Sequence, residues 1–170
     1  MTPASRLPPV SDLFSDLKHH HVGFSVADIE TAVAFYTGVL GFTVEDRKYI
    51  APIDTHLAFL RKGAARLEFF QKAGSRPIPE HRRAPNTDLG EQGTKHPCFS
   101  VADAQRALDI LSARDDCAIV GVIRKPGEPM RMEDDPTLAE NDPRPPAAAF
   151  FFRDPCGLIV EIVAARNFPD

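Results

Sequence analysis

Apolar and polar residues follow two kinds of spacing along this chain, one typical of strands and one typical of helices. In residues 19–26, apolar side chains occupy every second position and small or polar side chains lie between them, which predicts a strand. Asp28 is a preferred first residue of helices, and the apolar residues after it have helical spacing to about Leu40, where Gly38 or Gly41 ends the helix. Three further strands are predicted at residues 42–45, 56–60 and 65–70.

The same order of elements occurs a second time. Residues 21–28, HVGFSVAD, return at an offset of 75 as residues 96–103, HPCFSVAD, and six of the eight positions are identical. A second helix is predicted from Asp103 to about Ala113. The strands of this half are predicted at residues 96–101, 118–123, 147–152 and 158–163. Because an internal repeat indicates copies of one unit, the sequence predicts an α+β fold of two βαβββ modules.

The pattern divides the chain into consecutive parts. They are an N-terminal arm (residues 1–18), the first module (19–71), a linker (72–95) and the second module (96–165). A proline-rich insertion without periodicity, residues 125–146, interrupts the second module, and such loops are often functional, so we interpret it as a lid over a pocket. The basic group at residues 81–83 of the linker is expected to be solvated, with contact to an anionic ligand as the alternative.

The composition limits the classes of function. A hydrophobic content of 43% and a charged content of 26% are ordinary for a soluble globular domain. The net charge of −4 indicates no basic surface for nucleic acid or an anionic membrane, and no apolar segment reaches the roughly 20 residues that span a bilayer. The first residues lack the apolar region of a secretory signal. The three cysteines have neither zinc-type nor redox spacing, which indicates reduced thiols in a cytoplasmic protein.

Two histidines and two glutamates recur at equivalent positions of the two modules. His21 and His96 begin matching strands, and Glu68 and Glu161 each lie in the fourth strand of their module between apolar neighbours. Ionised glutamates are rarely buried without a partner or a metal ion. The residues that share each histidine's face are small and leave room beside it, and imidazole with carboxylate suits first-row divalent cations. The pattern therefore predicts one metal site formed by these four side chains.

Each of these residues has a simpler interpretation when it is considered alone. A single histidine at a strand start is more often a hydrogen-bonded structural residue, and a single glutamate in an apolar strand more often faces solvent at a sheet edge. The recurrence of all four at equivalent positions favours the metal site. His19 and His20 have no counterparts before His96, and the sequence therefore predicts no role for them.

With these positions in view, the sequence resembles the vicinal oxygen chelate superfamily, which has the glyoxalase and bleomycin-resistance fold. The resemblance extends over about residues 19–165. It is carried by the two repeated segments, by FYTGVLGF at residues 35–42, by Leu67-Glu68-Phe69 and by DPCGLIVE at residues 154–161.

The resemblance implies that the two modules form a U-shaped, partly open β-barrel around one metal ion, and that the chain is a homodimer. His21, Glu68, His96 and Glu161 match the ligand positions, and this two-histidine, two-glutamate set is most similar to the glyoxalase I type. The similar acyl-CoA epimerases usually have glutamine at the Glu68 position. Ring-cleaving dioxygenases use two histidines and one carboxylate, which leaves that position unused.

The resulting hypothesis is a divalent-metal-dependent lyase or isomerase, either glyoxalase-type or an epimerase. A small substrate chelated through neighbouring oxygens would react through an enolate or enediolate. Glu161 is expected to remove the proton and Glu68 to return it, or the reverse. The alternatives are a metal-free protein that sequesters a drug-like ligand and an Fe(II) ring-cleaving dioxygenase. The substrate, the metal (nickel, cobalt, zinc, manganese or iron) and the number of chains that supply the ligands stay open.

Overall fold

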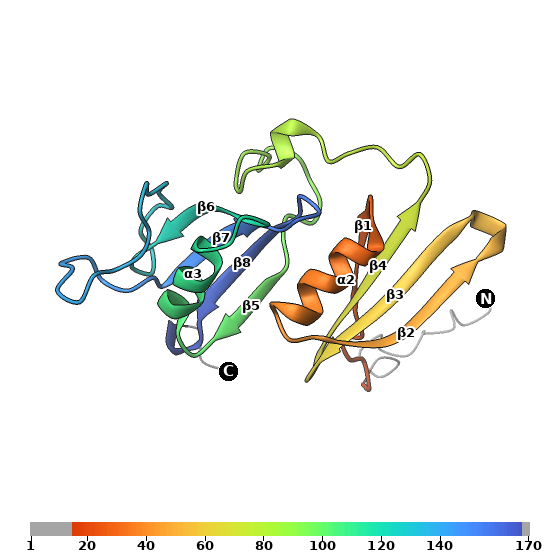
Figure 1. The fold of residues 1–170 in the computed structure, drawn as a ribbon, viewed down its shortest axis with the longest axis horizontal. Coiled ribbons are helices and arrows are strands. Elements are labelled where there is room, and N and C mark those ends of the chain that lie inside the picture. The colour runs from red at the N-terminus through yellow and green to blue at the C-terminus, as the bar shows by residue number, and fades with distance from the viewer. Residues whose placement is uncertain (1–14, 168–170) are drawn as a thin grey trace, which may run out of the picture.

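The computed structural model describes residues 15–167, which form the two predicted βαβββ modules (Figure 1). The first module comprises β1 (Val22–Val26), α2 (Ile29–Gly38), β2 (Thr43–Ile50), β3 (Thr55–Lys62) and β4 (Ala65–Lys72). The second comprises β5 (Cys98–Val101), α3 (Ala104–Ser112), β6 (Ala118–Ile123), β7 (Ala149–Arg153) and β8 (Ile159–Ala164). Short 3-10 helices lie at Ala51–Ile53, Glu80–Arg82 and Ala165–Asn167. Most of the predicted N-terminal arm, residues 1–18, lies outside the described residues.

Each module contains one four-stranded sheet, and the two sheets have the same topology. The strand order is β1-β4-β3-β2 in the first sheet and β5-β8-β7-β6 in the second. The first and last strands of each module pair in parallel, and the other neighbours are antiparallel. The α+β class is therefore confirmed, and the described residues form two separate sheets, as expected for a partly open arrangement.

The repeat extends to local irregularities and to the helix ends. The register shifts between Val44 and Asp46 in β2, and the same shift occurs 75 residues later in β6. The side chain of Asp28 accepts a hydrogen bond from the Glu30 backbone N–H, and that of Asp103 accepts one from Arg106. Both aspartates thus begin their helices as predicted, because each satisfies a backbone donor that the first turn leaves free.

The strand β2 is longer than the predicted strand at residues 42–45 and continues to Ile50. It lies at the edge of its sheet and pairs only with β3. Most of its side chains are exposed, and Glu45, Asp46, Arg47 and Lys48 follow one another. A charged, exposed edge strand lacks the apolar alternation on which the prediction depends, and such charges also protect an edge from pairing with other chains.

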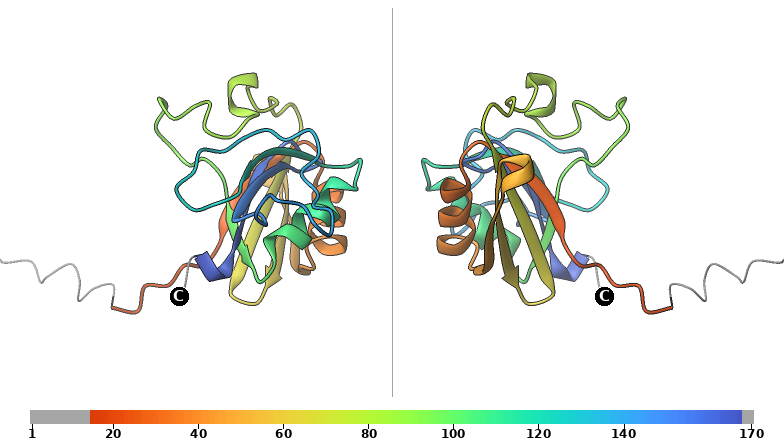
Figure 2. Two further views of the ribbon diagram at one scale, coloured as in Figure 1. Left: turned by 90° about the vertical axis from the view of Figure 1, so that its left-hand side faces the viewer. Right: turned by 90° about the vertical axis from the view of Figure 1, so that its right-hand side faces the viewer.

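One hydrophobic core connects the two modules. Both helices lie on the same side of the sheets (Figures 1 and 2). Phe35 on α2 contacts Phe152 on β7, with ring centroids 6.1 Å apart, and Phe42 contacts Phe99 at 5.8 Å. The same buried cluster includes Leu108 of α3. The modules therefore share one core on their helical side.

The linker and the insertion are both held by charged side chains. The linker crosses the ends of the sheets (Figure 2). Its Asp88 carboxylate pairs with Arg82 and Lys95. The insertion lies at the outer end of the second module (Figure 1). There the nearly buried Arg124 pairs with Glu133, whose pKa this hydrogen bond lowers. Arg124, which follows β6, also donates a hydrogen bond to Gln105 of α3 and so anchors the insertion there. The role of the insertion as a lid stays a prediction.

A search for membrane spans among residues 15–167 finds no helix with the length and apolar character that a crossing requires.

Asp154 is a buried carboxyl group at the junction of the modules. Its Oδ2 accepts a hydrogen bond from the Tyr36 hydroxyl at 3.1 Å, and its Oδ1 accepts bonds from the backbone N–H groups of Cys156 and Leu158. Burial raises the pKa of Asp154 to about 6, although the bonds from Leu158 and Tyr36 oppose this increase. The protonated form is therefore favoured by folding more than the ionised form.

The Asp154 titration predicts a pH-dependent stability. Because the pKa rises from 3.8 to about 6 on folding, the stabilising contribution is complete below pH 3.8 and is lost as the pH rises through 6. Urea unfolding measures the free energy of unfolding of the wild type and of Asp154→Asn. The wild-type value minus the variant value should fall by about 3 kcal/mol between acidic and neutral pH. A difference that does not change with pH would contradict this assignment.

Candidate functional site

The first predicted histidine and glutamate lie side by side in the first module. His21 immediately precedes β1, and the parallel pairing of β1 with β4 aligns Gly23 with Glu68. This register brings His21 Nε2 to 3.0 Å from Glu68 Oε2. The edge of the Phe59 ring packs against the imidazole, with centroids 5.5 Å apart and planes at 85°. We call His21, Glu68 and Phe59 the first half-site.

The second module repeats this arrangement. His96 precedes β5, and the parallel pairing of β5 with β8 aligns Cys98 with Glu161. His96 Nε2 lies 3.1 Å from Glu161 Oε2, and the Phe151 ring meets the imidazole at 5.1 Å and 86°. We call His96, Glu161 and Phe151 the second half-site. The two half-sites thus have the same residue types in the same geometry.

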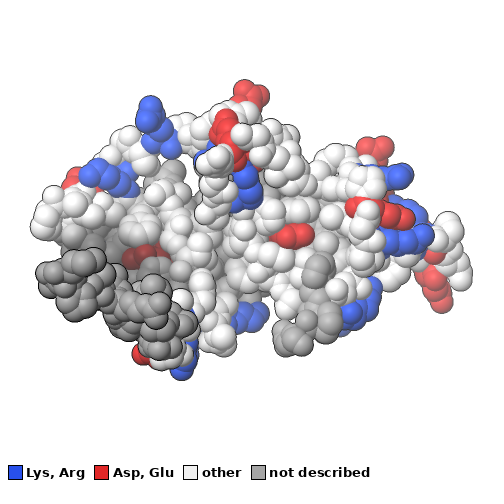
Figure 3. Space-filling model, turned by 180° about the vertical axis from the view of Figure 1, so that it is seen from behind, with Lys and Arg blue, Asp and Glu red and all other residues white. Residues whose placement is uncertain are grey.

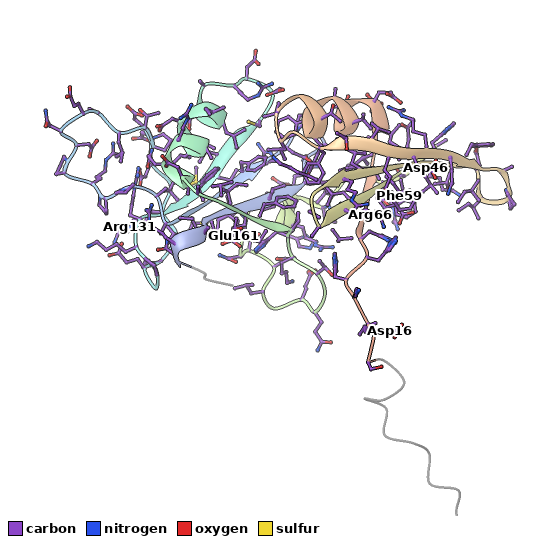
Figure 4. All side chains as sticks on the ribbon, turned by 90° about the horizontal axis from the view of Figure 1, so that it is seen from below. Asp16, Asp46, Phe59, Arg66, Arg131 and Glu161 are labelled. Atoms are coloured by element: carbon purple, nitrogen blue, oxygen red, sulfur yellow. The ribbon has the colours of Figure 1, made fainter. Side chains whose placement is uncertain are left out.

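Strand alternation places both half-sites on the open face of the sheets, away from the helices. The neighbours of Glu68, Leu67 and Phe69, are buried in the core. Glu161 lies on the second sheet and Phe59 on the first, on the side opposite the helices (Figure 4). From behind, isolated acidic groups lie in a largely uncharged surface (Figure 3). The side chains of Glu68 and Glu161 are 12% and 18% exposed, so each carboxylate is mostly but not fully withdrawn from water.

The two carboxylates have different neighbours. A Cβ on Gly23 would lie 2.8 Å from Phe70 Cε2, so the absent side chain allows Phe70 to cover β1 beside Glu68. The equivalent position in the second module is Cys98. Partial desolvation raises the pKa of the Cys98 thiol to about 12, and the negative charge of Glu161 adds to this increase. This thiol therefore stays protonated at neutral pH and can donate to the carboxylate.

His20, for which the sequence predicts no role, lies at the margin of the first half-site. Its Nδ1 is 2.6 Å from His21 Nδ1, and its Nε2 contacts Arg66. One of the two imidazoles must donate in the first contact. This hydrogen bond orients the His21 ring so that its Nε2 faces Glu68. In metal sites, a hydrogen bond to the ring nitrogen that does not bind the metal orients the histidine in the same way.

The donors of each half-site fit a divalent cation in kind but not in number. Imidazole nitrogen and carboxylate oxygen both suit first-row metals. Within residues 15–167, no group of three or more histidine, cysteine, aspartate or glutamate side chains is gathered for a metal ion. Catalytic zinc sites use three protein ligands, so one half-site is too small. The structure brings the four expected ligands together two by two, and their meeting at one ion stays a prediction.

Sequence reasoning missed the aromatic residues of the half-sites. Phe59 lies opposite Glu68 on β3, and Phe151 lies opposite Glu161 on β7. The signal was present in the strand register, because each phenylalanine is the direct cross-strand neighbour of a site glutamate. This signal can be used only when the antiparallel strand pairing is known. The alternation of residues within one strand does not reveal that pairing.

The duplicated βαβββ fold, with a histidine–glutamate pair on the open face of each sheet, defines the class of this protein. A family model described as Glyoxalase/Bleomycin resistance protein/Dioxygenase superfamily matches residues 18–162, and the chain belongs to this superfamily. The predicted resemblance is thereby confirmed at the level of the superfamily.

Solved structures show the same fold. A glyoxalase family protein from Enterococcus faecalis has 22% identity and a TM-score of 0.58, with 86% of this chain and 96% of that one covered. The trypanothione-dependent glyoxalase I of Leishmania major has 17% identity and a TM-score of 0.59, with 89% of each chain covered. Glyoxalase I from Zea mays has 15% identity and a TM-score of 0.58, covering 86% of this chain and 44% of its own. A comparison with curated proteins gives no match.

The crowding at Gly23 predicts an unequal response to two glycine substitutions. In Gly23→Ala the new Cβ would crowd Phe70, and overpacking of this kind should destabilise the fold by about 1 kcal/mol or more. Gly38→Ala is the matched control, because a Cβ there meets nothing within 4 Å and should be neutral or stabilise by up to about 1 kcal/mol. Urea unfolding of both variants measures the difference, and equal effects would contradict the close packing of Phe70.

Proposed function

We propose that this protein is a divalent-metal-dependent lyase or isomerase, glyoxalase-type or an epimerase, that acts on a small substrate with neighbouring oxygens. The observation that carries the proposal is the duplication of one half-site, with nitrogen-to-oxygen distances of 3.0 and 3.1 Å. A partly withdrawn carboxylate beside an imidazole is costly to keep without a function or a counter-charge. The occurrence of such a pair at the equivalent position of each module favours a common functional role for the two pairs.

The proposed metal ligands are His21, Glu68, His96 and Glu161, supplied by two copies of the chain. One chain gathers them only in pairs among its described residues, so a second copy is the simplest source of the other pair. In a two-fold dimer, a first half-site that meets the partner's second half-site generates two identical centres. A homodimer would therefore complete both sites at once.

Glu161 would remove a proton from a substrate carbon, and Glu68 would return a proton to the neighbouring carbon in a glyoxalase-type reaction or to the opposite face of the same carbon in an epimerase. A bound divalent ion (nickel, cobalt, zinc, manganese or iron) would supply Lewis acidity for a substrate with developing negative charge. Glu161, which lies opposite Cys98 on the open face, is the proposed base. Glu68, which lies beside Phe70, is the proposed acid. Phe59 and Phe151 would limit the access of water.

Replacing the proposed base separates proton transfer from metal binding. In Glu161→Gln the amide oxygen can still bind the metal but the side chain cannot accept a proton, so turnover should fall by about a hundredfold or more with metal content unchanged. Glu140→Gln, in the exposed part of the insertion, is the control and should behave as wild type. Turnover of hemithioacetals of 2-oxo aldehydes and of acyl-CoA thioesters, together with elemental analysis, measures both properties. Full activity in Glu161→Gln would exclude it as the base.

The shared site predicts complementation between two defective variants. His21→Ala and His96→Ala should each lose the metal as homodimers. In a mixed dimer, one centre combines both substitutions, while the other contains only intact half-sites. Random mixing by unfolding and refolding should therefore restore about one quarter of the wild-type metal content and activity.

A centre formed within one chain gives no restoration after the same mixing, and this result would exclude the shared site. The other two functions give separate outcomes. A ligand-sequestering protein would gain no activity with any divalent metal, and a ring-cleaving dioxygenase would consume oxygen with a catechol and Fe(II).

A further inference from the structure

Three arginines line one cavity outside both half-sites. The cavity has a volume of about 470 Å³ and lies between the end of β1, the start of the linker and the turn after β7. Arg76 and Arg83 come from the linker, and Arg153 is the last residue of β7. The hydroxyl-bearing Ser25 and Ser75 lie in the same wall. Among the residues that the structure describes, the lining contains cationic and hydroxyl side chains and no carboxylate.

These arginines lack the partners that neighbouring basic residues have. Within residues 15–167, none of Arg76, Arg83 and Arg153 forms an ion pair with a carboxylate, and Arg83 Nε donates to the Ile78 carbonyl at 2.9 Å. By contrast, Arg82 pairs with Asp88 at 3.1 Å. Asp154, which follows Arg153 in the chain, is turned into the core and accepts a hydrogen bond from Tyr36. Three positive charges around one cavity repel one another unless an anion lies between them.

The cavity continues toward the second half-site. A neighbouring cavity of about 360 Å³ shares Ser25 and Ile78 with it and is lined by Gly23 and His96. Both cavities are lined by Ser25 at the edge of β1 and by Ile78 of the linker, so they adjoin along this edge. A ligand in this groove could reach His96 with one end and the arginines with the other.

We infer that Arg76, Arg83 and Arg153 form a binding site for the phosphate or carboxylate group of a small molecule. Guanidinium groups bind both kinds of oxyanion through paired, charge-assisted hydrogen bonds. Resting on the proposed function, this anionic group is the far end of the substrate whose neighbouring oxygens react at the half-sites. The expected substrate class is therefore a small acid or phosphorylated compound with a hydroxy- or oxo-carbonyl group at its other end.

The test is the direct binding of two simple anions to the full chain at low ionic strength. Inorganic phosphate and succinate are titrated separately, with the backbone amide resonances of Ser25 and Gly157 as local reporters. Saturable changes in the chemical shifts of these amides are expected. The anion that binds with the higher affinity identifies the chemical class of the ligand. The double substitution of Arg83→Gln and Arg153→Gln should weaken binding about tenfold or more, because two charge-assisted contacts are lost.

Arg106→Gln on the exposed surface of α3 is the matched control and should bind both anions as wild type does. His96→Ala should also retain anion binding, so the result does not depend on metal or turnover. Absence of metal-dependent activity in the wild-type protein, with intact anion binding, would overturn the proposed function alone. Absence of saturable binding, or equal weakening in Arg106→Gln, would overturn the anion site alone. Unfolding measurements on the double variant show whether a loss of binding reflects a loss of fold.

Discussion

The parallel pairing of the first and last strands in each module is the constraint on which the site depends. It aligns the residue two positions after each histidine with a glutamate, and it brings imidazole and carboxylate to about 3 Å in both sheets. A shift of one residue would turn Glu68 into the helical core and expose Leu67. Burial of an unpaired ionised carboxylate costs several kcal/mol, so core packing and site geometry select the same register.

The duplication also creates a useful difference between its two copies. Glu161 has a thiol neighbour in Cys98, whereas Glu68 has glycine at the equivalent position and Phe70 above it. Glu161 and Glu68 are proposed as base and acid, and these unlike neighbours make the two half-sites chemically different. A perfectly symmetric pair of modules could not separate these roles without help from the substrate.

Much of the fold could be predicted from the sequence, because it depends on local patterns. The capping aspartates, the apolar alternation and the 75-residue repeat located both helices and most strands to within a few residues. The charged edge strand β2 was underestimated, since its exposed side chains show no core-facing alternation. The conformation of the insertion could not be predicted either. It depends on a side-chain ion pair between Arg124 and Glu133, which a hydrophobic periodicity does not reveal.

The candidate site was predictable in its members but not in its assembly. Equivalence between the modules identifies His21, Glu68, His96 and Glu161, whereas their relative positions depend on contacts such as Phe35 with Phe152 and Tyr36 with Asp154. Those contacts place the shared core on the helical side. The open face consequently carries two separate histidine–glutamate pairs. The sequence pattern of one chain contains no information about how two such faces would contact each other. In the proposed dimer, a second copy of the chain would approach the open face, because the other face of each sheet is already covered by the helices and the shared core.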